Sequence, residues 1–120
     1  MAARTPEEVF AHHADVLVKG DVEGIISDYA EDAIFVTSSG IREGKEGVRA
    51  AFEELLAAIP DAQWDVPVAV FSGDILYIEW SAASSDARVS DGVDTFVFRD
   101  GLIRAQTVRY TIEKESRSAP

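Results

Sequence analysis

The chain has 120 residues, which suits one domain that buries about two-thirds of its unfolded surface around a single core. It contains no cysteine, which excludes a disulfide framework and thiolate chemistry, and no apolar run approaches the ~18 residues of a membrane span. The net charge of −11 argues against nucleic acid and anionic membranes as partners, and residues 1–6 are too short and polar for a signal peptide. We therefore expect a cytoplasmic protein, with a small neutral ligand left open.

Two helices are predicted at the start of the chain. Thr5, Pro6 and Glu8 have the spacing of a capping box with proline at the first helical position, and Gly20 ends this helix. Its apolar stripe consists of Val9, Phe10, His13, Ala14, Val16 and Leu17. Asp21 then caps a second, short helix. The apolar face of that helix consists of Val22, Ile25, Ile26 and Tyr29.

A strand is predicted over residues 33–37, with a loop at 38–40. A third helix is expected from Lys45 to about Ile59, because apolar residues recur at helical spacing and Pro60 follows its end. Its stripe consists of Val48, Ala51, Phe52, Leu55 and Ile59.

The rest of the chain is predicted to be sheet. Residues 63–71 alternate, and Pro67 within them indicates an edge strand or a bulge. One face of this strand would carry Trp64, Val66, Val68 and Val70. Residues 75–83 form the next strand and 84–87 a loop.

A long hairpin is predicted at the end. Strands over 92–98 and from 102 to about 114 flank Arg99-Asp100-Gly101, and Asp-Gly between such runs favours a primed turn. Asp94 shares a strand face with Phe96 and Phe98. An acid on an aromatic face indicates either a pocket or a structurally engaged carboxylate.

This order of elements predicts the α+β class. Three N-terminal helices would pack in a strongly curved, mixed, mostly antiparallel sheet, with residues 63–114 as an antiparallel meander. Residues 1–120 form one domain, with a core over about 6–114 and a frayed tail at 115–120. Because strands such as 75–83 carry apolar residues on both faces, we expect a homodimer through the outer face of the sheet.

Four short motifs follow one another in the chain: Gly20-Asp21-Val22-Glu23-Gly24-Ile25, Tyr29-Ala30-Glu31-Asp32-Ala33, Gly44-Lys45-Glu46-Gly47-Val48-Arg49 and Asp100-Gly101-Leu102-Ile103. Together they resemble the nuclear transport factor two-like superfamily, over about residues 6–114. That superfamily includes ketosteroid isomerases, SnoaL-like polyketide cyclases and limonene epoxide hydrolases. The resemblance implies a cone-shaped, cystatin-like fold with a pocket at its open end, no cofactor, and commonly a dimer, but it does not specify an activity.

The resemblance assigns positions to several residues. Asp94 stands where ketosteroid isomerases carry a protonated aspartate, a known example of an acid kept neutral by an apolar site. His13 stands at the position of their tyrosine donor, and Thr37 at that of their aspartate base. If Asp94 is taken as the aspartate of the Arg-x-Asp pair of the epoxide hydrolases, Gly92 stands where that pair needs arginine. In SnoaL-like cyclases the acid/base aspartate lies on a late strand near this hairpin.

We therefore predict a site in which His13 and Asp94 lie within hydrogen-bond reach, directly or through one water. Both are candidate catalytic residues, because a buried histidine beside a carboxylate can act as a general base. The ligand contacts would be Tyr29, from the second helix, with Phe96, Gln106, Val108 and Tyr110. The alternatives are a core histidine bonded to a carbonyl and an inert acid near a strand end.

Other residues are given structural roles. Trp64 and Trp80 are expected in the core or an interface, and Glu79 on the surface. His12 is expected to be solvated, and it cannot chelate a metal with His13 because adjacent helical side chains diverge by about 100°. The residues with basic side chains near the third helix are expected to be solvated or to contact an anion: Arg42, Lys45 and Arg49.

Two classes of function remain open. The first is a small cofactor-independent enzyme, an isomerase, cyclase or hydratase, that performs acid/base chemistry on an apolar, oxygen-bearing metabolite. The second is a non-catalytic ligand-binding or dimerisation module of the same fold. Thr37 in place of a base favours the second, whereas the polar cluster around Asp94 favours the first.

Overall fold

The computed structural model describes residues 3–114. Its first two helices begin at the residues that the sequence predicts. Helix α1 (Pro6–Val18) opens with a capping box, in which the Glu8 backbone N–H donates to Thr5 Oγ1 (3.1 Å) and the Thr5 N–H donates to Glu8 Oε1 (2.8 Å). Helix α2 (Val22–Ile26) is capped by Asp21, which accepts a bond from the Gly24 N–H. Helix α3 (Gly44–Ala58) lies within one residue of the predicted bounds.

Seven strands form one mixed, open sheet within residues 3–114, and their order is β2-β1-β6-β5-β4-β3, with β7 paired to β5. The strands are β1 (Tyr29–Thr37), β2 (Gly40–Glu43), β3 (Gln63–Ser72), β4 (Ile75–Ala83), β5 (Ala87–Arg99), β6 (Leu102–Arg109) and β7 (Glu113–Lys114). Strands β1 and β6 are parallel, whereas β3 to β6 form the predicted antiparallel meander. The α+β class and the mixed, mostly antiparallel sheet are therefore confirmed.

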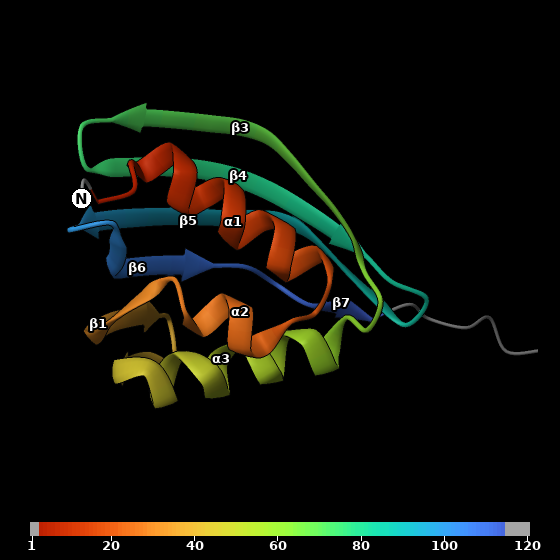
Figure 1. Ribbon diagram of the computed structural model, residues 1–120. Helices are drawn as coiled ribbons and strands as arrows, with labels where there is room; N and C mark the ends of the chain where they lie inside the picture. The colour runs from red at the N-terminus through yellow and green to blue at the C-terminus, as the bar shows by residue number, and fades with distance from the viewer. Residues whose placement is uncertain (1–2, 115–120) are drawn as a thin grey trace, which may run out of the picture.

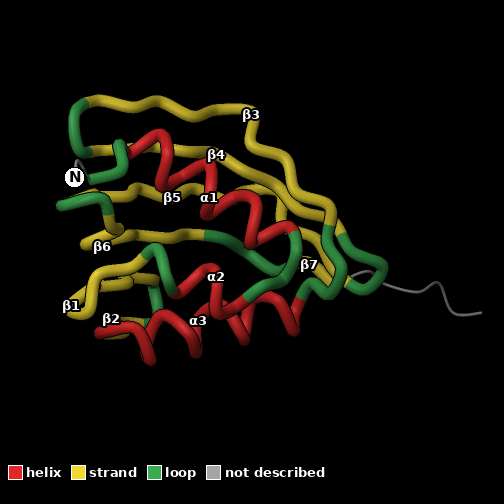
Figure 2. Tube along the Cα trace, viewed as in Figure 1, coloured by secondary structure: helices red, strands yellow, loops and turns green. Residues whose placement is uncertain are grey.

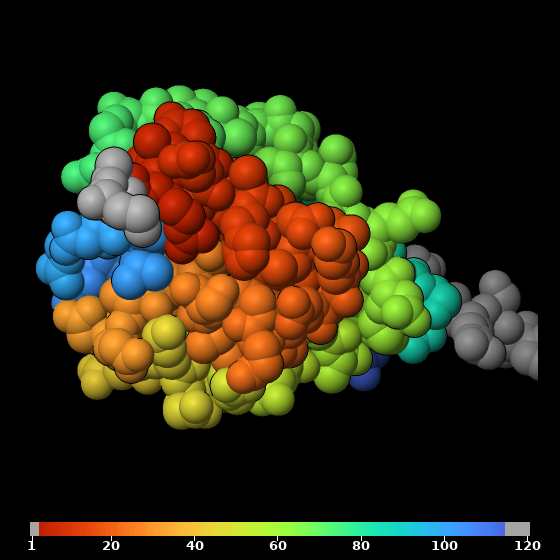
Figure 3. Space-filling view, in the orientation of Figure 1, coloured from red at the N-terminus to blue at the C-terminus, as the bar shows by residue number. Residues whose placement is uncertain are grey.

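The helices all lie on one side of the curved sheet. Helix α1 crosses in front of β4 and β5, while α2 and α3 lie beside β1 and complete the layer (Figure 1). The tube in Figure 2 shows β3 and β4 bending together at one end, and in Figure 3 the helices conceal most of the sheet from this side. The core is enclosed between these helices and the concave face. None of the helices in the described part of the chain is both long and apolar enough to span a membrane.

The β5–β6 hairpin turns at the predicted Asp-Gly pair. Asp100 and Gly101 both have positive φ, 55° and 76°, as a primed turn requires, and Arg99 pairs with Leu102. Phe96 and Phe98 are buried on the face that also carries Asp94, so the predicted sharing of one face is confirmed.

Strand β1 begins four residues earlier than predicted. Helix α2 ends at Ile26, and Tyr29 enters the sheet, where it pairs with Ile103 of β6. The assignment of Tyr29 to the second helix was wrong because its spacing from Ile25 also suits a helix. The sequence predicts a loop over 38–40 but not the short edge strand β2, which starts at Gly40.

The predicted face of β3 was wrong beyond Pro67. The strand is at the sheet edge, and its register with β4 shifts between Asp65 and Val68, so both expected effects of Pro67 are present. The extra residue reverses the alternation. Trp64 therefore packs against the core, whereas Val70 is 57% exposed on the outer face opposite Tyr77.

The final strand is shorter than predicted. Strand β6 stops at Arg109, and Thr111 donates to the Asp91 carboxylate through its backbone N–H and its hydroxyl, both at 2.8 Å. The chain then rejoins β5 through β7 at 113–114, while β5 itself begins at Ala87, inside the predicted loop. The predicted frayed tail, 115–120, lies outside the described residues.

Candidate functional site

A cavity of about 250 Å³ lies between the helices and the concave face of the sheet. Six of the seven predicted site residues line it: His13, Asp94, Phe96, Gln106, Val108 and Tyr110. Much of the remaining wall is aromatic, with Phe10, Phe35, Phe52, Trp64 and Trp80. A concave, mainly apolar space with few polar groups is the usual form of a small-molecule site.

Asp94 is the acidic residue of this wall. It lies on β5, is 6% exposed, and accepts two hydrogen bonds, from Trp80 Nε1 to Oδ1 at 2.8 Å and from Gln106 Nε2 to Oδ2 at 2.9 Å. Burial raises the pKa of the Asp94 carboxyl to about 6, and the two hydrogen bonds only partly oppose this rise. The carboxyl therefore gains and loses its proton near neutral pH.

Tyr29 lies behind the cavity rather than on its wall. Its hydroxyl donates to Gln106 Oε1 in the buried interior. Burial first, and then the charges of Asp94 and Asp28, raise the pKa of Tyr29 well above its usual value, so the hydroxyl keeps its proton. The Gln106 amide thereby has its oxygen toward Tyr29 and its N–H toward Asp94. Tyr29, predicted as a ligand contact, is thus connected to Asp94 through Gln106 and is not among the residues that line the cavity.

Trp80 reaches Asp94 because Gly92 has no side chain. The two residues are opposite one another in the β4–β5 register, and a Cβ placed on Gly92 would lie 2.2 Å from the indole Cε2. Sequence reasoning assigned Trp80 only to the core or an interface. The pairing of Trp80 with Gly92 would have indicated this contact, but it can be recognised only when the register of β4 and β5 is known, and residue spacing does not give that register.

His13 projects from α1 into a group of aromatic rings. Its ring centroid lies 5.6 Å from that of Phe96, 5.7 Å from Phe52 and 5.9 Å from Tyr29. The residue is 3% exposed, and its Nδ1 has no hydrogen-bond partner among residues 3–114. Burial lowers the pKa of His13 to about 4, so the imidazole is neutral at neutral pH.

The expected direct bond between His13 and Asp94 is not formed. Each Asp94 oxygen accepts from another side chain, Trp80 or Gln106, and His13 Nδ1 is unpaired. The alternative of a His13 Nδ1 bonded to a carbonyl is not observed either. The two residues instead both line the cavity.

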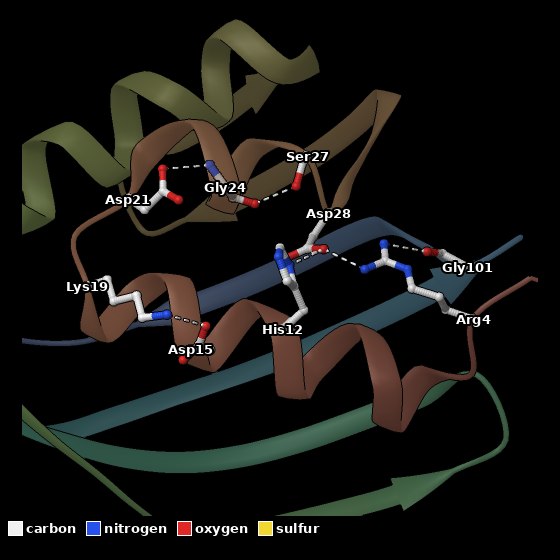
Figure 4. Close-up of polar contacts among 9 residues, drawn as sticks. All are labelled: Arg4, His12, Asp15, Lys19, Asp21, Gly24, Ser27, Asp28 and Gly101. Carbon is white, nitrogen blue, oxygen red and sulfur yellow. Dashed lines mark hydrogen bonds and ion pairs between the residues drawn. The ribbon is translucent and has the colours of Figure 1, made fainter.

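A second polar cluster lies on the other side of α1 and was not predicted (Figure 4). Asp28 is fully buried and pairs with Arg4 Nη1 at 2.9 Å and His12 Nδ1 at 2.8 Å. Arg4 also donates to the Gly101 carbonyl at 3.0 Å. His12, expected to be solvated, keeps 42% of its side chain exposed but is held by Asp28. A short polar turn after α2 carried no sequence signal of this burial.

The basic residues near α3 are engaged with glutamates. Arg42 pairs with Glu54 at 2.7 Å, Lys45 lies 3.9 Å from Glu31, and Arg49 bonds Glu23. Within residues 3–114, no three metal-ligating side chains are grouped so that they could hold an ion.

Solved structures of similar shape support the architecture. A candidate ketosteroid isomerase from Kribbella flavida has a TM-score of 0.74 and 20% identity, covering 96% of this chain and 82% of that one. IdmH, a candidate polyketide cyclase from Streptomyces antibioticus, has a TM-score of 0.74 and 18% identity, with 89% and 92% covered. An NTF2-like protein of unknown function from Cytophaga hutchinsonii has a TM-score of 0.75 and 14% identity, with 92% and 95% covered.

At these identities the similarity shows the fold alone. No curated protein matches the sequence. The SnoaL-like domain, however, matches residues 10–106, which include most of α1, both helices that follow it, and the positions of Asp94 and Gln106. The predicted resemblance to this group is thereby confirmed, and the chain belongs to the SnoaL-like domain family.

Proposed function

We propose that this protein binds a small, mainly apolar, oxygen-bearing molecule in the cavity and acts on it as a cofactor-independent acid/base enzyme, of the isomerase, cyclase or hydratase kind. One observation carries the proposal: a buried carboxyl, Asp94, stands on an apolar cavity wall with its pKa raised to about 6. A proton-transfer group is most effective when its pKa lies near the working pH.

Asp94 is the proposed proton carrier. As a carboxylate it takes a proton from an acidic C–H next to a carbonyl, or from a water that attacks the ligand, so a C–H or O–H bond breaks and the carboxyl O–H forms. The neutral acid then returns that proton to another atom of the ligand. Trp80 and Gln106 hold the two oxygens in place throughout, which limits the reorganisation that each transfer requires.

His13 is the proposed partner for the ligand oxygen. A neutral imidazole carries one N–H donor and one acceptor nitrogen. His13 lines the cavity, and its buried Nδ1 has no protein partner among residues 3–114, so a hydrogen bond from a ligand to this nitrogen would replace no existing interaction. Two neighbours of similar fold are described as a candidate isomerase and a candidate cyclase, which is consistent with this reaction class.

A second candidate is a ligand-binding module without catalysis. Thr37 favours it, because threonine cannot accept a proton from carbon at the position where the resembling isomerases carry an aspartate. In that case Asp94 and His13 would only orient the bound molecule.

The experiment uses 2-tetralone, an apolar bicyclic ketone with acidic α-hydrogens, in deuterated buffer. Wild-type protein should accelerate exchange of the α-hydrogens, and Asp94→Asn should slow that exchange by about 100-fold or more. Asp65→Asn, which changes an exposed aspartate outside the cavity, should exchange like wild type. Binding without accelerated exchange would favour the non-catalytic module, and no binding would contradict both candidates. Mass spectrometry of ligand retained through purification would identify the natural molecule.

A further inference from the structure

A second hollow adjoins the cavity and differs from it in chemistry. It has a volume of about 180 Å³ and shares with the main cavity the side chains of Phe35, Ala51, Val108 and Tyr110. Its other lining residues are all polar: Thr37, Ser38, Ser39, Arg42 and Glu54. A molecule that fills the apolar cavity can therefore extend past the shared wall into polar surroundings.

The hollow offers both donors and acceptors. Thr37 Oγ1 accepts from the Ser39 backbone N–H at 3.1 Å, which holds the turn between β1 and β2. Ser38 and Ser39 are exposed residues of this turn that line the hollow, and neither hydroxyl takes part in a side-chain hydrogen bond within residues 3–114. A hydroxyl can donate one hydrogen bond and accept two.

The charges in the hollow favour a neutral group over an anion. Arg42 Nη2 bonds both oxygens of Glu54, at 2.7 and 3.0 Å, so the positive charge is already matched. An anion would meet the Glu54 carboxylate in the same space, on a protein whose net charge is −11. An alcohol can instead donate to Glu54 and accept from Arg42 or a serine.

We infer that the ligand is an elongated molecule with two unlike ends, an apolar body with a carbonyl or acidic C–H in the main cavity and a neutral, hydroxyl-bearing end in the second hollow. This inference rests on the proposed function, because it assumes that the main cavity binds the apolar body. It adds the substrate class: a hydroxylated ring ketone or similar compound rather than a plain hydrocarbon or an acid.

The test compares three fluorescent probes with one body. They are 2-acetylnaphthalenes that carry at position 6 an ethyl, a 2-hydroxyethyl or a carboxymethyl group, and binding is followed by fluorescence titration. Wild-type protein should bind the hydroxyethyl probe about fivefold more tightly than the ethyl probe, as expected for one net hydrogen bond. The carboxymethyl probe should bind more weakly than the hydroxyethyl probe.

Variants locate the preference. The double variant Ser38→Ala, Ser39→Ala should bind the ethyl probe as wild type does and lose the fivefold preference. Arg42→Gln gives an independent variant of the same hollow, and the double variant Ser72→Ala, Ser85→Ala, outside both hollows, should keep the preference.

Several outcomes overturn the inference. These are equal binding of the hydroxyethyl and ethyl probes, tighter binding of the carboxymethyl probe, or a preference that persists without both serines and disappears in Asp94→Asn. Failure of every probe to bind overturns the proposed function, and this inference with it. Binding of all three with no preference leaves the proposed function standing alone.

Discussion

Asp94 and His13 depart from their usual pKa values in opposite directions for the same physical reason. Burial penalises the charged form of each, which raises the pKa of the carboxyl to about 6 and lowers the pKa of the imidazole to about 4. Between these pH values the cavity holds two largely neutral groups. A site that carries no net charge over this range suits an apolar ligand.

The orientation of Gln106 gives a prediction at this scale. Tyr29→Phe removes the hydroxyl that fixes the amide oxygen, so the amide can rotate and its N–H bond to Asp94 weakens. The pKa of Asp94 should rise from about 6 toward about 7, since a hydrogen bond to the charged form is lost. A carbon NMR titration of the Asp94 carboxyl would measure this. Tyr77→Phe, which removes only a surface bond to Glu79, is the control, and an unchanged pKa in Tyr29→Phe would refute the orienting role.

The two buried groups should also affect stability in opposite senses. Asp94 contributes stability that is complete below its ordinary pKa of 3.8 and is lost as pH rises through about 6. His13 contributes stability that is complete above its ordinary pKa of 6.5 and is lost as pH falls through about 4.

Variants should separate these two contributions. Relative to wild type, the free energy of unfolding of Asp94→Asn should improve by about 2 kcal/mol between pH 4 and pH 7. His13→Phe keeps an aromatic ring at this position. Relative to wild type, its free energy of unfolding should increase by about 2 kcal/mol as the pH falls from 7 to 4. Urea unfolding at a series of pH values would measure both differences. Parallel curves for a variant and wild type would show that the replaced group does not titrate as stated.

At the scale of elements, the cluster around Asp28 links three segments. The fully buried carboxylate lies between α2 and β1, and Arg4 connects it to the β5–β6 turn. Arg4→Met should cost about 3 kcal/mol of unfolding free energy, because it leaves the buried carboxylate with His12 as its remaining basic partner. Asp28→Asn should cost less, because the basic partners Arg4 and His12 are both partly exposed and can be solvated.

Thermal or urea unfolding would measure these costs. Lys19→Met provides the matched control, since it breaks an exposed ion pair with Asp15 and should change stability by about 0.5 kcal/mol or less. A similar loss for Arg4→Met and Lys19→Met would show that the buried cluster is not a stabilising link.

Most elements of this fold could be predicted because their signals are local. The capping box at Thr5 and the Asp100-Gly101 turn each depend on a few adjacent residues. The errors arose where long-range pairing decides the outcome. Tyr29 satisfies helical spacing but gains a parallel partner in β6, and the β3 bulge near Pro67 reverses a face that simple alternation assigns to the core.

The candidate site could be predicted only in part for the same reason. Strand alternation and helical spacing placed Asp94 and His13 on inward faces, and both line the cavity. Which atoms then meet depends on the strand register and the helix position to within an ångström or so. The bonds of Asp94 to Trp80 and Gln106 therefore emerge only in three dimensions.

At the scale of the whole molecule, the outer face of the sheet is the surface that the helices leave uncovered. One row of paired positions across it consists of Val70, Tyr77, Thr95, Thr107, Val36 and Ile41. Val70 and Ile41 are 57% and 64% exposed. Exposed apolar residues grouped on one face commonly mark an interface.

We predict a homodimer through this face. Sedimentation equilibrium at micromolar concentration should give twice the mass of one chain, and the double variant Val70→Lys, Ile75→Lys should give the monomer mass. Val18→Lys places the same charge on an exposed valine of α1 and should leave the dimer intact. A wild-type protein of monomer mass would contradict the prediction.

The contact between Trp80 and Gly92 constrains how this site can change over evolution or by design. A side chain at position 92, including the arginine of an Arg-x-Asp pair, would collide with the indole, while loss of the indole first would take from Asp94 one of its two donors. Each single substitution is therefore harmful in the background of the other residue. The two positions are therefore expected to change together.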